Sequence, residues 1–479
     1  MDIHSAIPIV GTSGELTEQM MLRASGLPPR YGNRIKVLLN CSENFTEWEA
    51  ALLEAKESIC IEMYIFAPDS FGKRLRDILL TKLAEGIHVA LVYDWLGSLN
   101  AHLRGFFKPL KAAGAEIRSY NPPKWTSGVG IFSRNHRKSI IIDEQIAFVS
   151  GLCISNAWKG KPEKGIEAWR DTGLRLEGPI VQDILDAFED TLIAAGGTPL
   201  KLKRYAREDT PPAGSVRARV LATTPENINT LRFDLNVIGL SSQNLWITDA
   251  YFMPTRMYVQ TLINAAKAGV DVRILVPRTS DIKWIGTVSR TQYRPLLEAG
   301  VRVFEWNGTM IHAKCALIDG QWARVGSTNL NMSSWYVNRE LDISIEDSST
   351  VYLLERIFLN DLNHATEVIL NEGAHTEFKE ARRKKFKLMQ RGRTKAVMRQ
   401  AIQLSHAFDI GFSGTRLVDE SEAWAFLTIG ITILLLAVTI YFIPQIIIWP
   451  LLLLLIIGGS GTALHAIKQL RKFKQNKHR

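Results

Sequence analysis

The stretch Asn135-His136-Arg137-Lys138-Ser139-Ile140-Ile141-Ile142-Asp143 has the spacing H-x-K-x4-D, which returns in Ile311-His312-Ala313-Lys314-Cys315-Ala316-Leu317-Ile318-Asp319. Alternate side chains of an extended strand lie on one face, so the histidine and lysine of each copy are expected to point the same way. The apolar residues after them are expected to continue as a buried strand that ends at the aspartate. Two histidines, each beside a lysine, suit phosphodiester chemistry without a metal ion.

The segments around the two copies also repeat. Residues 110–121 (LKAAGAEIRSYN) match residues 296–307 (LLEAGVRVFEWN), and residues 84–94 (AEGIHVALVYD) match residues 267–277 (KAGVDVRILVP). In each pair a helical pattern ends at a glycine and a strand rich in valine and isoleucine follows. This alternation predicts an α/β fold with a largely parallel sheet covered by helices.

The duplication predicts two similar halves, residues 33–205 and 206–370, after an N-terminal segment of residues 1–32. Each half has the length of an ordinary single domain. Two such halves can pack so that both histidine–lysine pairs meet at one cleft. We therefore expect one shared active site rather than two separate ones.

The repeated spacing resembles the phospholipase D superfamily, whose pattern H-x-K-x4-D-x6-G-[SG]-x-N is present twice. Within it, the chain is most similar to the bacterial cardiolipin synthases of the phospholipase D type, and nearest to the subgroup called cardiolipin synthase B. The similarity covers residues 33–370 and includes residues 305–308 (EWNG), 322–329 (WARVGSTN) and 169–172 (WRDT). It implies two similar phospholipase-D-like α/β halves that share one active site.

The two copies differ after the aspartate. The second copy keeps the family pattern with Gly326, Ser327 and Asn329, and the resemblance implies that Ser327 and Asn329 help to bind the substrate phosphate. The first copy has Ser150 and Cys153 where the pattern has glycine and asparagine. A thiol is a weak hydrogen-bond donor, so the site is expected to be asymmetric. Activity is expected to survive because both histidine–lysine pairs remain.

The resemblance implies that His136 attacks phosphorus and forms a phosphohistidine, which splits one difficult displacement into two. His312 would protonate the departing alcohol and then deprotonate the incoming one. Histidine suits both tasks because its pKa lies near neutral. Lys138 and Lys314 would neutralise the nonbridging oxygens of the phosphate. With two lysines in place, neither a metal ion nor a cofactor is expected.

Four carboxylates accompany the catalytic motifs. Asp143 and Asp319 complete the two motifs and are expected mainly to hold local structure and charge balance. Asp171 and Glu340 follow the motifs and are candidates to orient the histidines through Nδ1. The alternative for Asp171 and Glu340 is an ordinary surface or helix-capping carboxylate.

The C-terminal part of the chain predicts a membrane anchor. Residues 423–467 contain no Asp, Glu, Lys or Arg. One continuous helix of that length would span ~66 Å, about twice the ~30 Å hydrocarbon core of a bilayer. We therefore expect a transmembrane hairpin that turns at Pro444 and Pro450. The alternative, a helical hairpin buried inside the protein, is disfavoured because both runs are long and apolar.

Positive charge is concentrated beside this predicted hairpin. Residues 377–399 hold ten Lys and Arg against two Glu, and residues 467–479 hold six Lys and Arg and no acid. Because these segments carry +8 and +6 of a total of +10, the remaining residues sum to −4. Residues 377–408 are expected to form a basic amphipathic segment that favours anionic lipid, or else a solvated charged helix, and residues 468–479 a basic tail.

Positive ends on both sides of a hairpin place both in the cytoplasm. Residues 1–32 lack the apolar core of a signal peptide. The expected location is therefore the inner, cytoplasmic membrane, spanned more than once, with the catalytic body on the cytoplasmic side. The four cysteines, at positions 41, 60, 153 and 315, have no metal-type spacing and are expected to be reduced and buried.

The function expected from these features is a membrane-bound phosphatidyl transferase that makes cardiolipin from phosphatidylglycerol or a related phospholipid donor. A phospholipase D that hydrolyses phospholipids to phosphatidic acid uses the same chemistry and differs only in the access of water. A nuclease would need a basic catalytic face, which the net charge of −4 disfavours, so no nucleic-acid partner is expected. The double motif disfavours a non-catalytic membrane scaffold.

Overall fold

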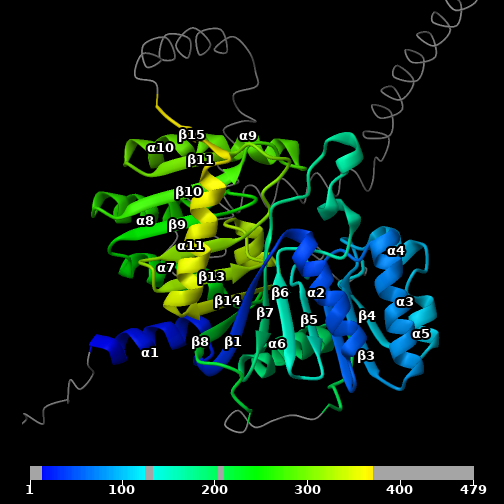
Figure 1. The fold of residues 1–479 in the computed structure, drawn as a ribbon. Coiled ribbons are helices and arrows are strands. Elements are labelled where there is room, and N and C mark those ends of the chain that lie inside the picture. Colours follow the sequence, from blue (N-terminus) through cyan, green and yellow to red (C-terminus); the bar gives the residue numbers. More distant parts are fainter. Residues whose placement is uncertain (1–12, 124–132, 203–209, 371–479) are drawn as a thin grey trace, which may run out of the picture. The chain divides into compact units, whose positions relative to one another are not determined.

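The computed structural model describes residues 13–123, 133–202 and 210–370, which are coloured in Figure 1. Within these residues no helix combines the length and the apolar character needed to cross a bilayer. The segments predicted as a basic amphipathic segment (377–408), a transmembrane hairpin (423–467) and a basic tail (468–479) lie outside the described residues. Those three assignments stay predictions.

The described part of the first half contains seven strands and five α-helices, and one further helix precedes it. Its strands are β1 (Arg30–Leu39), β2 (Ser58–Met63), β3 (His88–Asp94), β4 (Glu116–Tyr120), β5 (Ser139–Ile142), β6 (Ile146–Ser150) and β7 (Thr172–Glu177). Its helices are α2 (Asn40–Glu54), α3 (Ser70–Ala84), α4 (Leu99–Leu103), α5 (Lys108–Ala112) and α6 (Ile180–Ala194), after an N-terminal α1 (Ser13–Ser25). Short 3-10 turns at Asn156–Lys159 and Pro162–Lys164 precede β7.

The second half repeats this order and adds one strand. Its strands are β8 (Val216–Thr223), β9 (Asn244–Thr248), β10 (Asp271–Pro277), β11 (Arg302–Trp306), β12 (Cys315–Ile318), β13 (Trp322–Gly326), β14 (Glu340–Glu346) and β15 (Ala365–Val368). Its helices are α7 (Asn229–Leu240), α8 (Arg256–Lys267), α9 (Lys283–Thr291), α10 (Tyr293–Glu298) and α11 (Ser348–Leu362). A π-helical turn at Ser333–Val337 precedes β14.

The strand order shows the duplication directly. The first half runs β1-β7-β6-β5-β2-β3-β4, and the second runs β8-β14-β13-β12-β9-β10-β11, with β15 at the outer edge. The halves join where β1 pairs with β8, so that fifteen strands form one sheet across the molecule (Figure 1). Two similar α/β halves, as predicted from the repeated segments, are therefore present.

The sheet is not largely parallel, and that prediction is wrong. Only β2–β3, β3–β4, β9–β10 and β10–β11 are parallel among the neighbouring strands, and the other pairs are antiparallel. The strand after each histidine–lysine pair turns back within three residues, 143–145 or 319–321, to form a hairpin. So short a connection permits only antiparallel pairing. Helices alternate with strands only in the earlier part of each half, and the parallel pairs are found there.

The largest hydrophobic core lies between the two halves. It includes Ile184 and Phe188 on α6, Val325 and Ile343 on the second-half strands, and Phe358 on α11, all fully or almost fully buried. Residues 180–185 of α6 are all buried, and Ile184, Phe188 and Leu192, four positions apart, continue an apolar face along the helix. Separate clusters pack α2 and α3 on the first half and α7 and α8 on the second. The four cysteines are free and buried, as predicted.

Candidate active site

The two histidine–lysine pairs lie in extended segments just before β5 and β12, rather than within those strands. Each segment is held by the opposite half of the chain. The backbone N–H of His136 donates to the carbonyl oxygen of Arg339 at 2.9 Å, and that of His312 donates to the carbonyl oxygen of Arg170 at 2.7 Å. These bridges across the halves fix where each histidine enters the site.

The structure brings the two pairs to one cavity of about 580 Å³. Both histidines, Lys138 and Asn329 line it, and Lys314 reaches the ring of His312 with its Nζ 3.0 Å from both ring nitrogens. The expectation of a shared cleft therefore agrees with the geometry. The residues that line the cavity are Tyr64, Ile65, His136, Lys138, Cys153, Ser155, Ala157, Trp158, Trp169, Tyr251, Met253, Asp281, Ile282, Ile285, His312, Asn329, Asn331, Ser333, Ser334 and Asn338.

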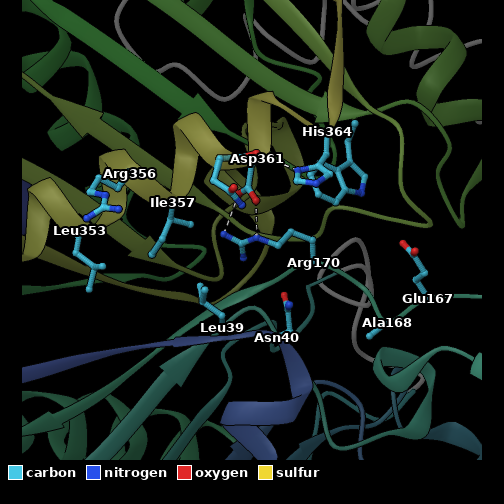
Figure 2. Close-up of a pocket in the computed structure, with 12 residues that line it drawn as sticks. Leu39, Asn40, Glu167, Ala168, Arg170, Leu353, Arg356, Ile357, Asp361 and His364 are labelled. Atoms are coloured by element: carbon cyan, nitrogen blue, oxygen red, sulfur yellow. Dashed lines mark hydrogen bonds and ion pairs between the residues drawn. The ribbon is translucent and has the colours of Figure 1, made fainter.

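A larger hollow of about 790 Å³ lies nearby (Figure 2). Figure 2 shows Arg170 directed at Asp361, to which its guanidinium donates at 3.0 Å and with which it forms an ion pair at 2.9 Å. Trp169 lines the catalytic cavity and Arg170 lines this hollow, so the two hollows lie on either side of one short segment. The larger hollow contains no histidine–lysine pair, and we place the chemistry in the smaller one.

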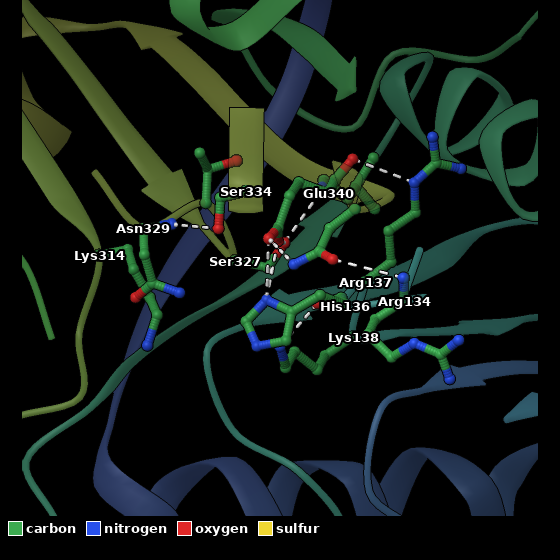
Figure 3. A network of polar contacts seen from close by, with 12 residues as sticks. Arg134, His136, Arg137, Lys138, Lys314, Ser327, Asn329, Ser334 and Glu340 are labelled. Atoms are coloured by element: carbon green, nitrogen blue, oxygen red, sulfur yellow. Dashed lines mark hydrogen bonds and ion pairs between the residues drawn. The ribbon is translucent and has the colours of Figure 1, made fainter. Parts of the chain in front are cut away.

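Each histidine is oriented by a buried carboxylate from the other half. Nδ1 of His136 lies 2.9 Å from Oε2 of Glu340 (Figure 3), and Nδ1 of His312 lies 2.8 Å from Oδ2 of Asp171. Both carboxylates are completely buried, so neither is the surface or capping residue that the sequence left open. With Nδ1 engaged, Nε2 of His136 remains for a substrate, whereas Nε2 of His312 lies 3.0 Å from the Nζ of Lys314.

Burial and neighbouring charges set the protonation of these groups. Burial lowers the pKa of His312 to about 4, with Lys314 acting in the same direction and Asp171 opposing it. Burial also lowers the pKa of His136, against the influence of Glu340. Although burial acts to raise them, the facing histidines and lysines hold the pKa values of Asp171 and Glu340 below their usual range. At neutral pH each ring is therefore a neutral imidazole beside an ionised carboxylate.

The two lysines are buried against tyrosine rings that the sequence did not single out. Lys138 donates to the carbonyl oxygen of His136 at 2.6 Å and lies 5.4 Å from the ring centroid of Tyr64. Lys314 donates to the carbonyl oxygen of His312 and lies 5.7 Å from the ring centroid of Tyr251. Burial lowers the pKa of Lys138, and it lowers that of Lys314 to about 8. An anionic substrate would offset the cost of burying these two cations.

The loops after β6 and β13 differ in the way the sequence indicated. Asn329 is buried and lines the cavity, and its side-chain oxygen has no hydrogen-bond partner among the described residues. The hydroxyl of Ser327 has a different contact from the predicted one, because it donates to Oε2 of Glu340 at 2.6 Å (Figure 3). Ser327 thus positions a carboxylate, and it is not among the residues that line the cavity. Cys153 lines the cavity in the first half.

In the first half, a different side chain makes the contact with the carboxylate that Ser327 makes in the second half. Gly151 occupies the position equivalent to Ser327, and a Cβ atom there would lie 2.5 Å from Oδ1 of Asp171. The indole N–H of Trp158 instead donates to Oδ2 of Asp171 at 3.3 Å. Trp158 also lines the cavity, with its ring centroid 5.6 Å from that of His312. No periodicity or motif spacing would have identified this tryptophan.

The motif aspartates lie at the far ends of β5 and β12, away from the residues that line the cavity. The carboxylate of Asp143 accepts the backbone N–H groups of residues 56–58, and that of Asp319 accepts those of residues 242–244. Both residues have positive φ, 52° and 53°, at tight turns. Their placement fits the expected structural role and not a catalytic one. No group of three or more His, Cys, Asp or Glu arranged to hold a metal occurs in the part of the chain that the structure describes.

Comparison with known proteins gives the family. A family model described as "Cardiolipin synthase, PLD-like domain" matches residues 49–168 and 235–362, and the chain belongs to this family. It is similar to "Cardiolipin synthase 1" of Bacillus anthracis, with 31% identity over 78% of this chain and 74% of that protein. It is also similar to "Cardiolipin synthase" of Halalkalibacterium halodurans, with 33% identity over 75% and 72%.

The chain is accordingly an enzyme, a phospholipid phosphatidyltransferase. Its fold is similar to that of a solved phosphatidylserine synthase from Haemophilus influenzae Rd KW20, with a TM-score of 0.58 over 78% of this chain and 98% of that one. The two sequences are 16% identical, so this likeness concerns the fold alone. The assignment to the cardiolipin synthase B subgroup stays a prediction.

Proposed function

We propose that this enzyme makes cardiolipin by moving a phosphatidyl group from phosphatidylglycerol, or a related donor, to a second phosphatidylglycerol. The transfer passes through a phosphohistidine on His136 and needs no metal ion. One observation carries the proposal: two imidazoles, each beside a lysine and each oriented by a carboxylate of the other half, line a single cavity. Relatives that are 31% and 33% identical over 78% and 75% of the chain are cardiolipin synthases by name.

In the first step, Nε2 of His136 attacks the phosphorus of the donor. The neutral state of His136 leaves the lone pair free, and Glu340 stabilises the positive charge that develops on the ring. The bond from phosphorus to the headgroup oxygen breaks, and His312 gives a proton to that oxygen. The anionic phosphodiester raises the pKa of His312 when it binds, because a negative charge favours the protonated ring. Both lysines and Asn329 contact the nonbridging oxygens.

In the second step, a hydroxyl of the acceptor attacks the phosphohistidine. His312, now neutral, removes the proton from this hydroxyl, the bond between Nε2 of His136 and phosphorus breaks, and His136 is regenerated. The predicted anchor and its basic flanks would keep the cavity at the membrane surface, where both substrates are lipids. The access of water to the phosphohistidine decides between transfer and hydrolysis.

The test is expression of the full chain in cells that lack cardiolipin, followed by analysis of their lipids. The wild type is expected to restore cardiolipin, and His136→Ala and His312→Ala are expected to abolish it. His88→Ala, which changes an exposed histidine at the start of β3, is the matched control and is expected to behave as the wild type. Wild-type protein that is present in the membrane but yields phosphatidic acid in place of cardiolipin would overturn the proposal.

The covalent intermediate has its own test. Rapid quenching with labelled phosphatidylglycerol is expected to trap the label on a peptide that contains His136. A label on His312 would reverse the two roles while leaving the transfer intact. A transfer that proceeds at full rate in His136→Ala would exclude the phosphohistidine.

A further inference from the structure

The cavity holds one residue that its proposed chemistry does not explain. Asp281 is the one acidic side chain among the described residues that line the cavity, and it shares that cavity with both histidines and Lys138. A carboxylate in a site for an anionic phosphodiester repels the substrate. The side chain of Asp281 is exposed, so a ligand that donates hydrogen bonds can reach it.

The hydrogen bonds of Asp281 with described residues all reach the same oxygen. The hydroxyl of Tyr251 donates to Oδ1 at 2.9 Å, and the hydroxyl of Ser280 donates to the same oxygen at 3.2 Å. No hydrogen bond from another described residue reaches Oδ2. Asp281 precedes α9, but the residue at the N-cap of that helix is Ile282, and the structure shows no side-chain capping bond there. Helix capping therefore does not account for the carboxylate.

Tyr251 links Asp281 to the surroundings of His312. Tyr251, which holds Asp281, has its ring centroid 5.8 Å from that of His312. Trp169 lies on the same histidine, at 5.6 Å between ring centroids. His312 is the proposed acid and base for the alcohol, so a carboxylate that is linked to it through Tyr251 is a candidate to contact the rest of that alcohol.

We propose that Asp281, held by Tyr251, recognises the headgroup of the lipid that accepts the phosphatidyl group, and that this headgroup is a polyol such as glycerol. The proposal rests on the proposed function. One hydroxyl attacks phosphorus and passes its proton to His312, as the bond from His136 to phosphorus breaks. A neighbouring hydroxyl donates a hydrogen bond to Oδ2 of Asp281. This contact holds the attacking hydroxyl in position for phosphorus and favours the acceptor over water.

A polyol fits this site better than an ammonium group. Lys138 and Lys314 lie at the cavity as cations, and they would repel a second positive charge. Hydroxyls donate to a carboxylate without that repulsion. Ile282 and Ile285, which follow Asp281 in the chain, also line the cavity and offer an apolar surface to the rest of a lipid acceptor.

The test measures how the phosphohistidine is shared between acceptors, with the full chain in membranes and labelled phosphatidylglycerol as donor. Asp281→Ala is expected to lower the ratio of cardiolipin to phosphatidic acid about tenfold or more, as for the loss of a hydrogen bond to a charged group. Asp281→Asn keeps an acceptor oxygen, so a smaller loss is expected. Tyr251→Phe keeps the ring but releases Asp281, and it is expected to lie between the wild type and Asp281→Ala. Asp77→Ala, on the exposed surface of α3, is the matched control.

A competition between added glycerol and added ethanol makes the proposal specific. With unlabelled phosphatidylglycerol as donor and both alcohols isotope-labelled, the wild type is expected to incorporate glycerol in preference to ethanol, and Asp281→Ala is expected to lose that preference. An unchanged product ratio and an unchanged preference in both Asp281 variants would overturn the inference. A second competition compares glycerol with ethanolamine. A wild type that prefers ethanolamine, together with an Asp281→Ala variant that loses this preference, would also overturn the inference.

Failure of the inference can be told apart from failure of the proposed function. A wild type that makes no cardiolipin overturns the proposed function itself. A wild type that makes cardiolipin, beside Asp281 variants with the same ratios, overturns only the inference. Should Asp281→Ala fail to fold, Asp281→Asn is nearly the same in shape and decides the question alone.

Discussion

At the scale of single residues, the site depends on how each imidazole is held. A histidine bound through Nδ1 to an ionised carboxylate presents Nε2 outward, and the carboxylate stabilises the ring when it becomes positive. Glu340 does this for His136 and is itself held by the hydroxyl of Ser327. Trp158 contributes the corresponding contact to Asp171. The two rings thus have similar supports built from different residues.

Glu340→Gln is expected to slow the formation of the phosphohistidine by about 100-fold or more, because an amide cannot stabilise the developing imidazolium as a carboxylate does. Rapid-quench measurement of the labelled enzyme checks this. Glu346→Gln, at the other end of β14, is the matched control and is expected to react as the wild type. An unaltered rate in Glu340→Gln would show that the contact with His136 is structural only.

His312 predicts how stability depends on pH. Its pKa in the folded protein is about 4, below the ordinary value of 6.5, so below pH 6.5 the unfolded chain binds a proton that the folded chain does not. The free energy of unfolding therefore falls as the pH falls through this window, by about 2 kcal/mol between pH 7.5 and pH 5 from this residue.

Denaturant unfolding of His312→Gln at these two pH values is expected to show a loss smaller by that amount. His88→Gln serves as the control and should keep the wild-type dependence. The idea fails if His312→Gln and the wild type lose the same stability on acidification.

At the scale of secondary-structure elements, the sequence was most informative where the chain repeats. The positions of both histidine–lysine pairs, the following strands and the two halves could be read from it. The hairpins could not, since the apolar runs before Asp143 and Asp319 are equally compatible with parallel strands. The pairing of each histidine with the carboxylate of the other half was also out of reach, because 204 residues separate His136 from Glu340.

The aromatic side of the cavity shows a similar limit. Tyr251 stands at the head of a segment, residues 251–254, that matches residues 65–68, and this repeat was a usable signal. Tyr64 precedes the matching segment and has no such signal. Aromatic residues are common in buried positions, so their sequence context alone does not separate a wall of the site from ordinary core.

Asp143→Ala is expected to lower the free energy of unfolding by about 1–3 kcal/mol, because it removes three backbone hydrogen bonds and leaves alanine at a positive φ. Asp143→Asn tolerates that backbone conformation and is expected to lose less. Chemical unfolding checks both. Asp319→Ala, the equivalent in the second half, should behave alike. A loss of transfer activity without a loss of stability would instead indicate a catalytic role for these aspartates.

At the scale of the described body, the main core is common to both halves. α6 belongs to the first half by sequence, yet its buried face packs in the cluster that includes strands of the second. Either half alone would expose this surface to water. We therefore expect the body to unfold as one cooperative unit.

Phe188→Ala, in the middle of α6, is expected to lower the free energy of unfolding by about 3–5 kcal/mol through loss of packing in this core. Ile193→Ala is the matched control, since Ile193 lies on the same helix with 49% of its surface exposed. Calorimetry is expected to show one shifted transition in Phe188→Ala. Two separate transitions would mean that the halves unfold independently.

Each histidine is bound by a carboxylate of the other half, and this arrangement bears on how both repeats of an internal duplication are retained. After duplication, one copy is ordinarily free to accumulate changes until only its scaffold survives. Here each copy contains the carboxylate that orients the histidine of the other copy. A substitution that unfolds either copy would therefore affect both histidine rings. In the described part of the chain, Ser150 and Cys153, where the first copy departs from the family pattern, are not among the side chains that hydrogen-bond to Asp171 or Glu340.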